Sequence, residues 1–246
     1  TVFAYNMCMT TSGIVFNYTY GSNSTANMVI QNSHFSTNFG KKEIIDNARS
    51  SATSTANLRV YNCTFDSNVI PDPANGTVIH SRGNTATPRS TVVVRNTAFI
   101  MNTINTNVDV RNDNSQDVYL YNNYYDTGNR WSGGLAANSD NVIGGVSLND
   151  CSSLINAGST DVRLGDDLNL ITPISFTGKT INGNDRNKLG QVDISHFEFQ
   201  GIFESLTIMF PSKRATRITM RQDAALCPSP YHSSKTTRFA IKANGG

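Results

Sequence analysis

The chain is poor in charged residues and cysteine, and it has no long apolar run. Charged residues make up 15% of its 246 residues. No stretch approaches the roughly 18 consecutive apolar residues that mark a membrane-spanning helix, so we expect no membrane-spanning segment. Thr1 opens almost directly on a strand-like segment, without the charged, apolar and cleavage-site regions of a signal peptide. We interpret this N-terminus as a processed or truncated end.

The cysteines are too few and too scattered for a metal site or a disulfide framework. None of the four follows the short spacing of a zinc ligand set. Isolated thiols in a repetitive β structure usually act as small core residues. We therefore predict no metal site and no disulfide among Cys8, Cys63, Cys151 and Cys227.

What the sequence does contain is a repeat. A five-residue segment ending in Asn occurs five times, and the spacing between its Asn residues averages 29. Segments of 20 to 50 residues that recur in this way indicate a solenoid. The aligned segments are Val2-Phe3-Ala4-Tyr5-Asn6, Met28 to Asn32, Leu58 to Asn62, Val92 to Asn96 and Val118 to Asn122.

Each copy reads as a strand with one buried face, because the residues four and two before the Asn are always apolar. Stacking such copies at the strand spacing of about 4.8 Å buries the apolar face against the next copy. The sequence therefore predicts an all-β protein, a parallel β-helix of about six coils with a closing segment. Its crossovers should be right-handed.

Two side-chain columns should accompany the stacked strands. The aligned Asn residues can hydrogen-bond to one another and to the backbone of their bends. Three residues later comes a large apolar side chain, which we expect to form one inward stack. Its members are Met9, Phe35, Phe65, Phe99 and Tyr125.

The charge balance divides the chain near Gly201. Residues 201–246 hold seven basic and two acidic residues, a net of +5, which leaves −3 for residues 1–200. We therefore predict a β-helix with its closing segment over 1–200 and a basic C-terminal extension over 201–246. This extension is either a solvated tail, a partner-binding segment or an anchor.

The repeats carry a family resemblance. Phe35-Ser-Thr-Asn38, Phe65-Asp-Ser-Asn68 and Phe99-Ile-Met-Asn102 are similar to the Phe-x-x-Asn element of bacterial polymorphic outer-membrane and adhesin-type proteins. The Val-x-Val-x-Asn strands resemble right-handed β-helices of the pectin-lyase-like superfamily. Asn156-Ala-Gly158 and Gly190 to Gln200 resemble the closing segment of choice-of-anchor Q β-helix proteins, although Ser195 and His196 replace the usual Gly-Ala. The resemblance implies a secreted or outer-membrane-associated protein of the bacterial cell surface.

The exposed face of the repeated strand is rich in aromatic and arginine side chains. Such a platform suits stacking on sugar rings or on a protein partner, unless long turns cover it. A nucleic-acid ligand is not expected, because the basic excess lies in the tail. The predicted ligand-binding residues are Tyr5, Arg59, Tyr61, Arg95, Tyr119 and Tyr121.

A second strand in each coil places Phe16, Asp46, His80 and Arg111 at successive levels of one outward column. If the protein is an enzyme, His80 or Asp46 is the candidate base, and Arg111 would neutralise a uronate carboxylate. The alternative is an ordinary stack of exposed charges. Hydrolysis would require carboxylates clustered on successive coils, and Asp46 and Asp109 each stand alone at their level.

The sequence thus leaves two functions open. The first is a glycan- or partner-binding, adhesin-like module whose partner is a polysaccharide or a host or cell-surface molecule. The second is a polysaccharide lyase or glycoside hydrolase acting on an acidic polysaccharide. No cofactor is expected, and calcium is the one ion left open, because Asp161, Asp166 and Asp167 are close in sequence.

Overall fold

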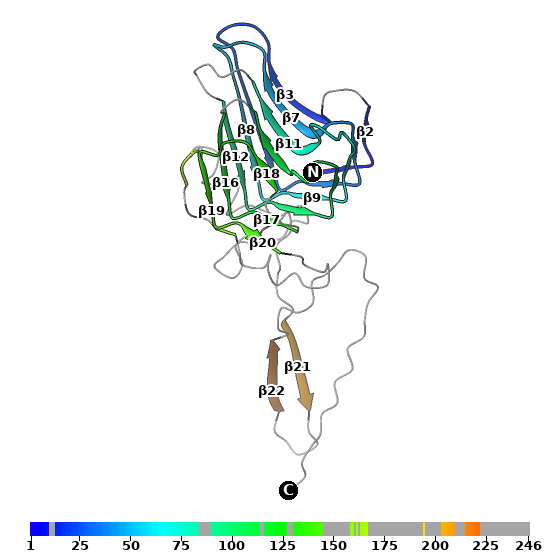
Figure 1. Cartoon of the computed structure of the whole chain (residues 1–246). Helices are drawn as coiled ribbons and strands as arrows, with labels where there is room; N and C mark the ends of the chain where they lie inside the picture. The colour runs from blue at the N-terminus through cyan, green and yellow to red at the C-terminus, as the bar shows by residue number, and fades with distance from the viewer. Residues whose placement is uncertain are drawn as a thin grey trace.

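The computed structural model describes residues 1–9, 13–83, 90–113, 116–126, 130–144, 158–159, 161, 163–166 and 194 in full, and the strand backbone of 203–209 and 215–221. All regular elements of these residues are β-strands. Up to β20 they wind into a solenoid with four sheets along its sides (Figure 1). Every strand pair within these four sheets is parallel. The predicted parallel β-helix is therefore confirmed.

We name the four sheets A to D in the order in which the chain visits them. Sheet A consists of β1 (Val2–Ala4), β5 (His34–Ser36), β9 (Thr64–Asp66), β13 (Ala98–Ile100), β17 (Tyr124–Tyr125) and β20 (Val142–Ile143). Sheet B consists of β2 (Met7–Cys8), β6 (Phe39–Gly40), β10 (Val69–Ile70) and β14 (Thr103–Ile104).

The longer strands lie in the other two sheets. Sheet C consists of β3 (Val15–Thr19), β7 (Glu43–Arg49), β11 (Thr77–Arg82), β15 (Val110–Asn112) and β18 (Trp131–Ser132). Sheet D consists of β4 (Thr25–Gln31), β8 (Thr55–Tyr61), β12 (Thr91–Arg95), β16 (Asp117–Tyr121) and β19 (Ala137–Ser139). Strands β1 to β16 make about four complete coils, fewer than the six that the repeat spacing predicts.

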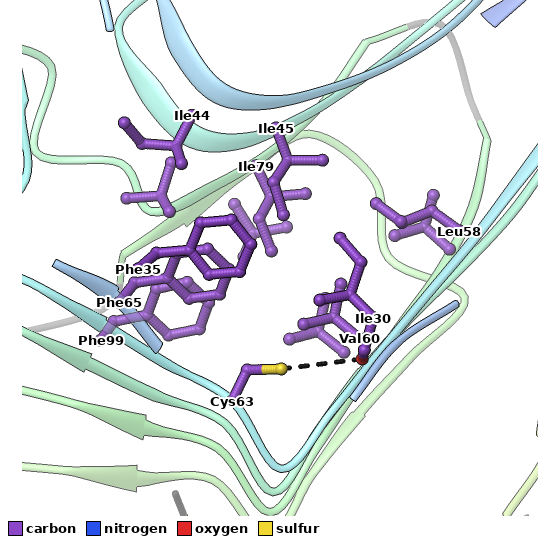
Figure 2. Packing of buried hydrophobic residues seen from close by; sticks show 14 of the residues in the cluster. Ile30, Phe35, Ile44, Ile45, Leu58, Val60, Cys63, Phe65, Ile79 and Phe99 are labelled. Atoms are coloured by element: carbon purple, nitrogen blue, oxygen red, sulfur yellow. Dashed lines mark hydrogen bonds between the residues drawn. The ribbon is translucent and has the colours of Figure 1, made fainter. Parts of the chain in front are cut away.

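An aromatic column fills the centre of the solenoid. The rings of Phe35, Phe65 and Phe99 stack face to face between the aliphatic side chains of sheets C and D (Figure 2). Adjacent ring centroids lie 4.7 to 5.2 Å apart, and Tyr125 continues the stack. All four side chains are fully buried. Stacking of this kind stabilises the core beyond the large apolar area that each ring removes from water.

Asparagine side chains, one after each aromatic ring, form a second column. The Nδ2 of Asn6 donates to the Oδ1 of Asn38 at 3.0 Å, and the same bond joins Asn38 to Asn68 and Asn68 to Asn102 at 2.9 Å. The ladder is formed by the Asn that lies three residues after each aromatic ring. The sequence analysis instead expected it at the Asn of the bend that precedes each ring. There, Asn32, Asn62, Asn96 and Asn122 adopt positive φ between 47° and 52°. Asn is favoured at these bends because its side chain tolerates left-handed backbone.

The first coil corrects the sequence alignment. Strand β1 pairs with β5, so Phe3 lies on Phe35 with ring centroids 4.5 Å apart. Phe3, and not Met9, therefore heads the aromatic stack. Residues Phe3 to Asn6 are a Phe-x-x-Asn element that resembles the strand-and-Asn segment closely enough to be confused with it, and Asn6 is equivalent to Asn38 rather than Asn32.

The remaining described elements are two strands of the predicted extension. Strands β21 (Phe203–Met209) and β22 (Ala215–Arg221) pair in antiparallel register. None of the described residues forms a helix that is long and apolar enough to cross a membrane.

Candidate functional site

The outward column predicted on the second strand exists on sheet C. Phe16 lies beside Asp46, Asp46 beside His80, and His80 beside Arg111, each pair on neighbouring strands. Their neighbours in sequence, including Ile45 and Ile79, point into the core. Because side chains alternate along a strand, this column faces away from the core.

A second outward column runs two residues further along the same strands and supplies ionic partners to the first. Arg82 binds Asp46 with two nitrogens, one of them Nε at 2.9 Å from Oδ1. His80 Nε2 lies 2.8 Å from the Asp113 carboxylate, and Arg111 Nε donates to the same carboxylate at 3.0 Å. We call this group of five residues the ionic cluster. Diagonal contacts between opposite charges on one sheet face of this kind stabilise neighbouring strands.

The pKa values of the two carboxylates in the ionic cluster are shifted in opposite directions. Burial raises the pKa of Asp46, and the hydrogen bond and charge of Arg82 only partly oppose that effect. Burial also acts on the pKa of Asp113, but the bonds from His80 and Arg111 outweigh it and leave this pKa below its usual value. The face thus combines one carboxyl that holds its proton more tightly with one that holds it less tightly.

A third carboxylate, which the sequence analysis missed, lies at the start of β7. Glu43 is fully buried, with one oxygen 3.8 Å from His80 Nδ1 and the other 4.0 Å from Arg82 Nη2. Within the described part of the chain neither oxygen accepts a hydrogen bond. Because Glu43 follows Lys41 and Lys42, the sequence predicts a solvated turn at this position. The one signal against that reading is that the buried pair Ile44-Ile45 follows directly.

An aromatic strip borders the ionic cluster along β3. Phe16 and Tyr18 stack with centroids 5.1 Å apart, and the ring of Tyr20 lies 6.5 Å from that of Tyr18. All three side chains are exposed, Tyr20 by 85%. The strip and the ionic cluster together make one continuous face of sheet C.

The sheet D face, on which the sequence places the aromatic platform, is not open to solvent, because residues 158–166 lie over it where they are described. Tyr61 and Arg95 are completely buried, and Tyr121 nearly so. Arg95 forms an ion pair with Asp166 and donates to the carbonyl of Ser159 at 2.9 Å. From the sequence, an outward-pointing arginine on a strand is expected to be exposed to solvent. Here Arg95 is instead paired with the carboxylate of Asp166, which lies 71 residues further along the chain.

The other contacts of this covering segment are equally specific. Tyr61 Oη donates to Asp166 at 3.3 Å, and Tyr121 Oη donates to the carbonyl of Leu164 at 3.0 Å. Gly165 has a φ of +89°, and a Cβ there would meet the ring of Tyr119 at 2.7 Å. The segment therefore packs on sheet D through a position that only glycine fits.

The other predicted ligand-binding residues divide between two places. Arg59 and Tyr119 are half-buried on sheet D, whereas Tyr5 does not belong to that sheet. Tyr5 lies at the bend after β1 with a φ of 57° and is 79% exposed. Its assignment to the platform followed from the misaligned first coil.

Among the described residues, no group of three or more His, Cys, Asp or Glu side chains is placed so that it could hold a metal ion. Of the three aspartates considered for calcium, Asp166 is held by Arg95, Asp161 is exposed, and Asp167 lies outside the described residues. Cys63 lies in the core with its Sγ 3.2 Å from the carbonyl of Tyr61, and Cys8 is half-buried. Cys151 and Cys227 lie outside the described residues.

No protein-family model, no curated protein and no solved structure matches the chain.

Proposed function

We propose that the protein is a secreted or cell-surface glycan-binding module, and that it binds its ligand on the outer face of sheet C. The observation that carries the proposal is the aromatic strip beside the ionic cluster. Exposed rings can stack on the apolar faces of sugars, and the partly exposed side chains of Arg82, Arg111 and Asp113 can hydrogen-bond to hydroxyl groups. The resemblance of the repeats to adhesin-type and pectin-lyase-like β-helix proteins supports the same class of ligand.

The geometry favours sheet C over sheet D as the binding face for a simple reason. Phe16, Tyr18 and Tyr20 are exposed, and the side chain of Arg82 is 38% exposed. The aromatic residues of sheet D are already occupied by the chain itself. A ligand on sheet D would first have to displace a buried ion pair.

The proposal is tested by binding to a panel of polygalacturonate, alginate and a neutral glucan. Tyr18→Ala and Tyr20→Ala should each weaken binding by about 1 to 3 kcal/mol, the range for an interface anchor. Their thermal midpoints should stay close to that of the unaltered protein. Tyr5→Ala is the control, since it removes from another face a ring that is about as exposed as that of Tyr20. Unchanged binding in both strip variants would refute this site.

A second candidate function is a polysaccharide lyase or glycoside hydrolase centred on Asp46, His80 and Arg111. Glu43 favours it, because a buried carboxylate without a hydrogen bond among the described residues is an unusual feature near a histidine. Arg111 is bound to Asp113 and to the carbonyl of Ala74, so its proposed pairing with a uronate requires it to leave these partners.

The two functions are distinguished by assaying the same polysaccharides for new unsaturated or reducing ends. If the protein is an enzyme, Glu43→Gln and His80→Ala should each lower turnover at least about a hundredfold, as for loss of a general base. Met101→Ala, at an exposed bend, is the control. Binding without new chain ends in the unaltered protein supports the module and rejects the enzyme.

A further inference from the structure

The end of the segment that covers sheet D is a turn that is complete in itself. The backbone nitrogen of Asp166 donates to the carbonyl of Arg163 at 3.1 Å, and the backbone nitrogen of Arg163 donates to the Asp166 carboxylate at 2.8 Å. Gly165, with its positive φ, takes the third position, where a type II turn requires glycine. We call residues 163–166 the strap. They belong to no strand, so lifting the strap from sheet D breaks no hydrogen bond between strands.

The strap brings no large apolar side chain into its contact with sheet D. The apolar cluster beneath it consists of sheet D residues such as Tyr61 and Tyr121. Leu164, the large apolar residue of the strap, is 72% exposed. The strap meets the sheet through polar groups: the Asp166 carboxylate binds Arg95 and Tyr61, and the Leu164 carbonyl accepts from Tyr121. The strap therefore removes no large apolar side chain of its own from water when it closes.

The cover of sheet A is different. Ile194 is fully buried there and packs in one cluster with Ala98 and Tyr124. Burying such an aliphatic side chain is favourable by itself, and it makes Ile194 a part of the core. The comparison indicates that sheet A is closed by packing and sheet D by exchangeable polar contacts.

The ion pair under the strap does not fully offset the burial that it requires. Burial lowers the pKa of the Arg95 guanidinium, and the charge and hydrogen bond of Asp166 oppose this effect only in part. In such a buried pair the loss of hydration offsets much of the attraction between the charges. Removing one partner is costly, whereas replacing the carboxylate by another carboxylate is not. Asp166 can therefore be exchanged for a competing acidic group.

The groups that sheet D recognises on the covering segment are those of a peptide. Arg95 and Asn96 both donate to the carbonyl of Ser159, at 2.9 and 3.0 Å. The backbone nitrogen of Ser159 donates in return to Asn96 Oδ1 at 3.1 Å. A second main-chain carbonyl and one carboxylate complete the set. An acidic sugar chain has carboxylates but no succession of main-chain amides, so this pattern favours a peptide.

We propose that the outer face of sheet D is a binding site for an acidic peptide segment of a partner protein, and that the strap occupies this site in an autoinhibitory contact. The partner supplies a carboxylate to Arg95 and Tyr61, and its main chain takes the place of Ser159 and Leu164. This site lies on another face of the solenoid than the glycan site proposed on sheet C and does not depend on it.

The test opens the strap in the full chain in two independent ways. Asp166→Asn removes the charge that holds it, and Gly165→Ala places a Cβ against the ring of Tyr119. The probe is a labelled synthetic peptide with the sequence of residues 158–166. Both variants should bind it at least about tenfold more tightly than the unaltered protein, because the site is then available in a larger fraction of molecules. Leu164→Ala is the matched control, since that side chain points to solvent and its loss should change nothing.

Hydroxyl-radical oxidation of Tyr61 and Tyr121 reports the position of the strap. Both tyrosines should become reactive in the two opened variants and be protected again by the peptide. A peptide with Asn at the place of Asp166 should lose most of this binding, and Tyr18→Ala should leave it unchanged.

Tyrosines that stay protected in both variants, or equal binding of the Asp and Asn peptides, would overturn the proposal. Protection by polygalacturonate and not by the peptide would assign the face to a sugar chain instead. Sedimentation of the unaltered protein as a dimer that Gly165→Ala dissociates would also overturn it, because the occupant is then the strap of a second copy.

Discussion

The outer faces of sheets C and D are made of similar residues but differ in what lies over them. Both carry aromatic rings and arginine–aspartate pairs. On sheet D the aspartate comes from residues 158–166, and the pair and its aromatic neighbours are buried. On sheet C the partners come from adjacent coils, and the aromatic strip stays exposed. Composition of a strand face therefore does not decide its role; the covering segment does.

The largest expected effect concerns the core on which both faces rest. Phe65→Ala should lower the free energy of unfolding by about 3 to 5 kcal/mol, because it opens a cavity inside a stack that packs on both sides. Chemical denaturation measures this loss. A cost below about 1 kcal/mol would contradict the continuous aromatic column.

The second largest expected effect is a difference in stability cost between arginine variants of the sheet D and sheet C faces. Arg95→Ala leaves the buried Asp166 carboxylate without its ionic partner and should cost about 3 kcal/mol. Arg82→Ala should cost only about 1 kcal/mol, because the Arg82 side chain is partly solvated and Asp46, whose pKa is already raised by burial, can take up a proton. Denaturation curves of the two variants give the comparison. Equal costs would mean that the two faces are covered to the same extent.

The smallest effect is the acid response of the sheet C face. The pKa of Asp113 is lower in the folded protein than its usual value of about 4, so its ionised form stabilises the fold above that pH. This contribution is lost as the pH falls through the folded pKa. The difference in thermal midpoint between the unaltered protein and Asp113→Asn should therefore be present at pH 7 and shrink by pH 3. A difference that grows on acidification would reverse the assigned direction.

The repeat made most of the fold predictable from the sequence. The period of two in strands such as Leu58–Tyr61 and the recurring Phe65 placed the sheets and the aromatic stack correctly. The register of Asp46 with His80 and Arg111 also follows from counting along the repeat. The first coil was misaligned because Phe3 to Asn6 satisfies two elements of the repeat at once.

The coverage of the faces could not be predicted in the same way. Contacts such as that of Tyr61 with Asp166 join residues 105 positions apart, outside any periodic pattern. Glu43 was missed for a related reason, since its burial depends on its neighbours in space rather than on its neighbours in sequence. A repeat determines which residues point outward, and only the segments between repeats determine which of them meet solvent.

The most direct test of the proposed binding face is hydroxyl-radical footprinting of the intact protein, read residue by residue with mass spectrometry, with and without a bound polysaccharide. Without ligand, Tyr18 and Tyr20 should be oxidised readily, and Tyr61 and Tyr121 should be protected. Bound ligand should protect Phe16, Tyr18 and Tyr20 and leave the tyrosines of sheet D unchanged. Ready oxidation of Tyr61 and Tyr121, or protection on binding that appears only there, would contradict the assignment of the ligand to sheet C.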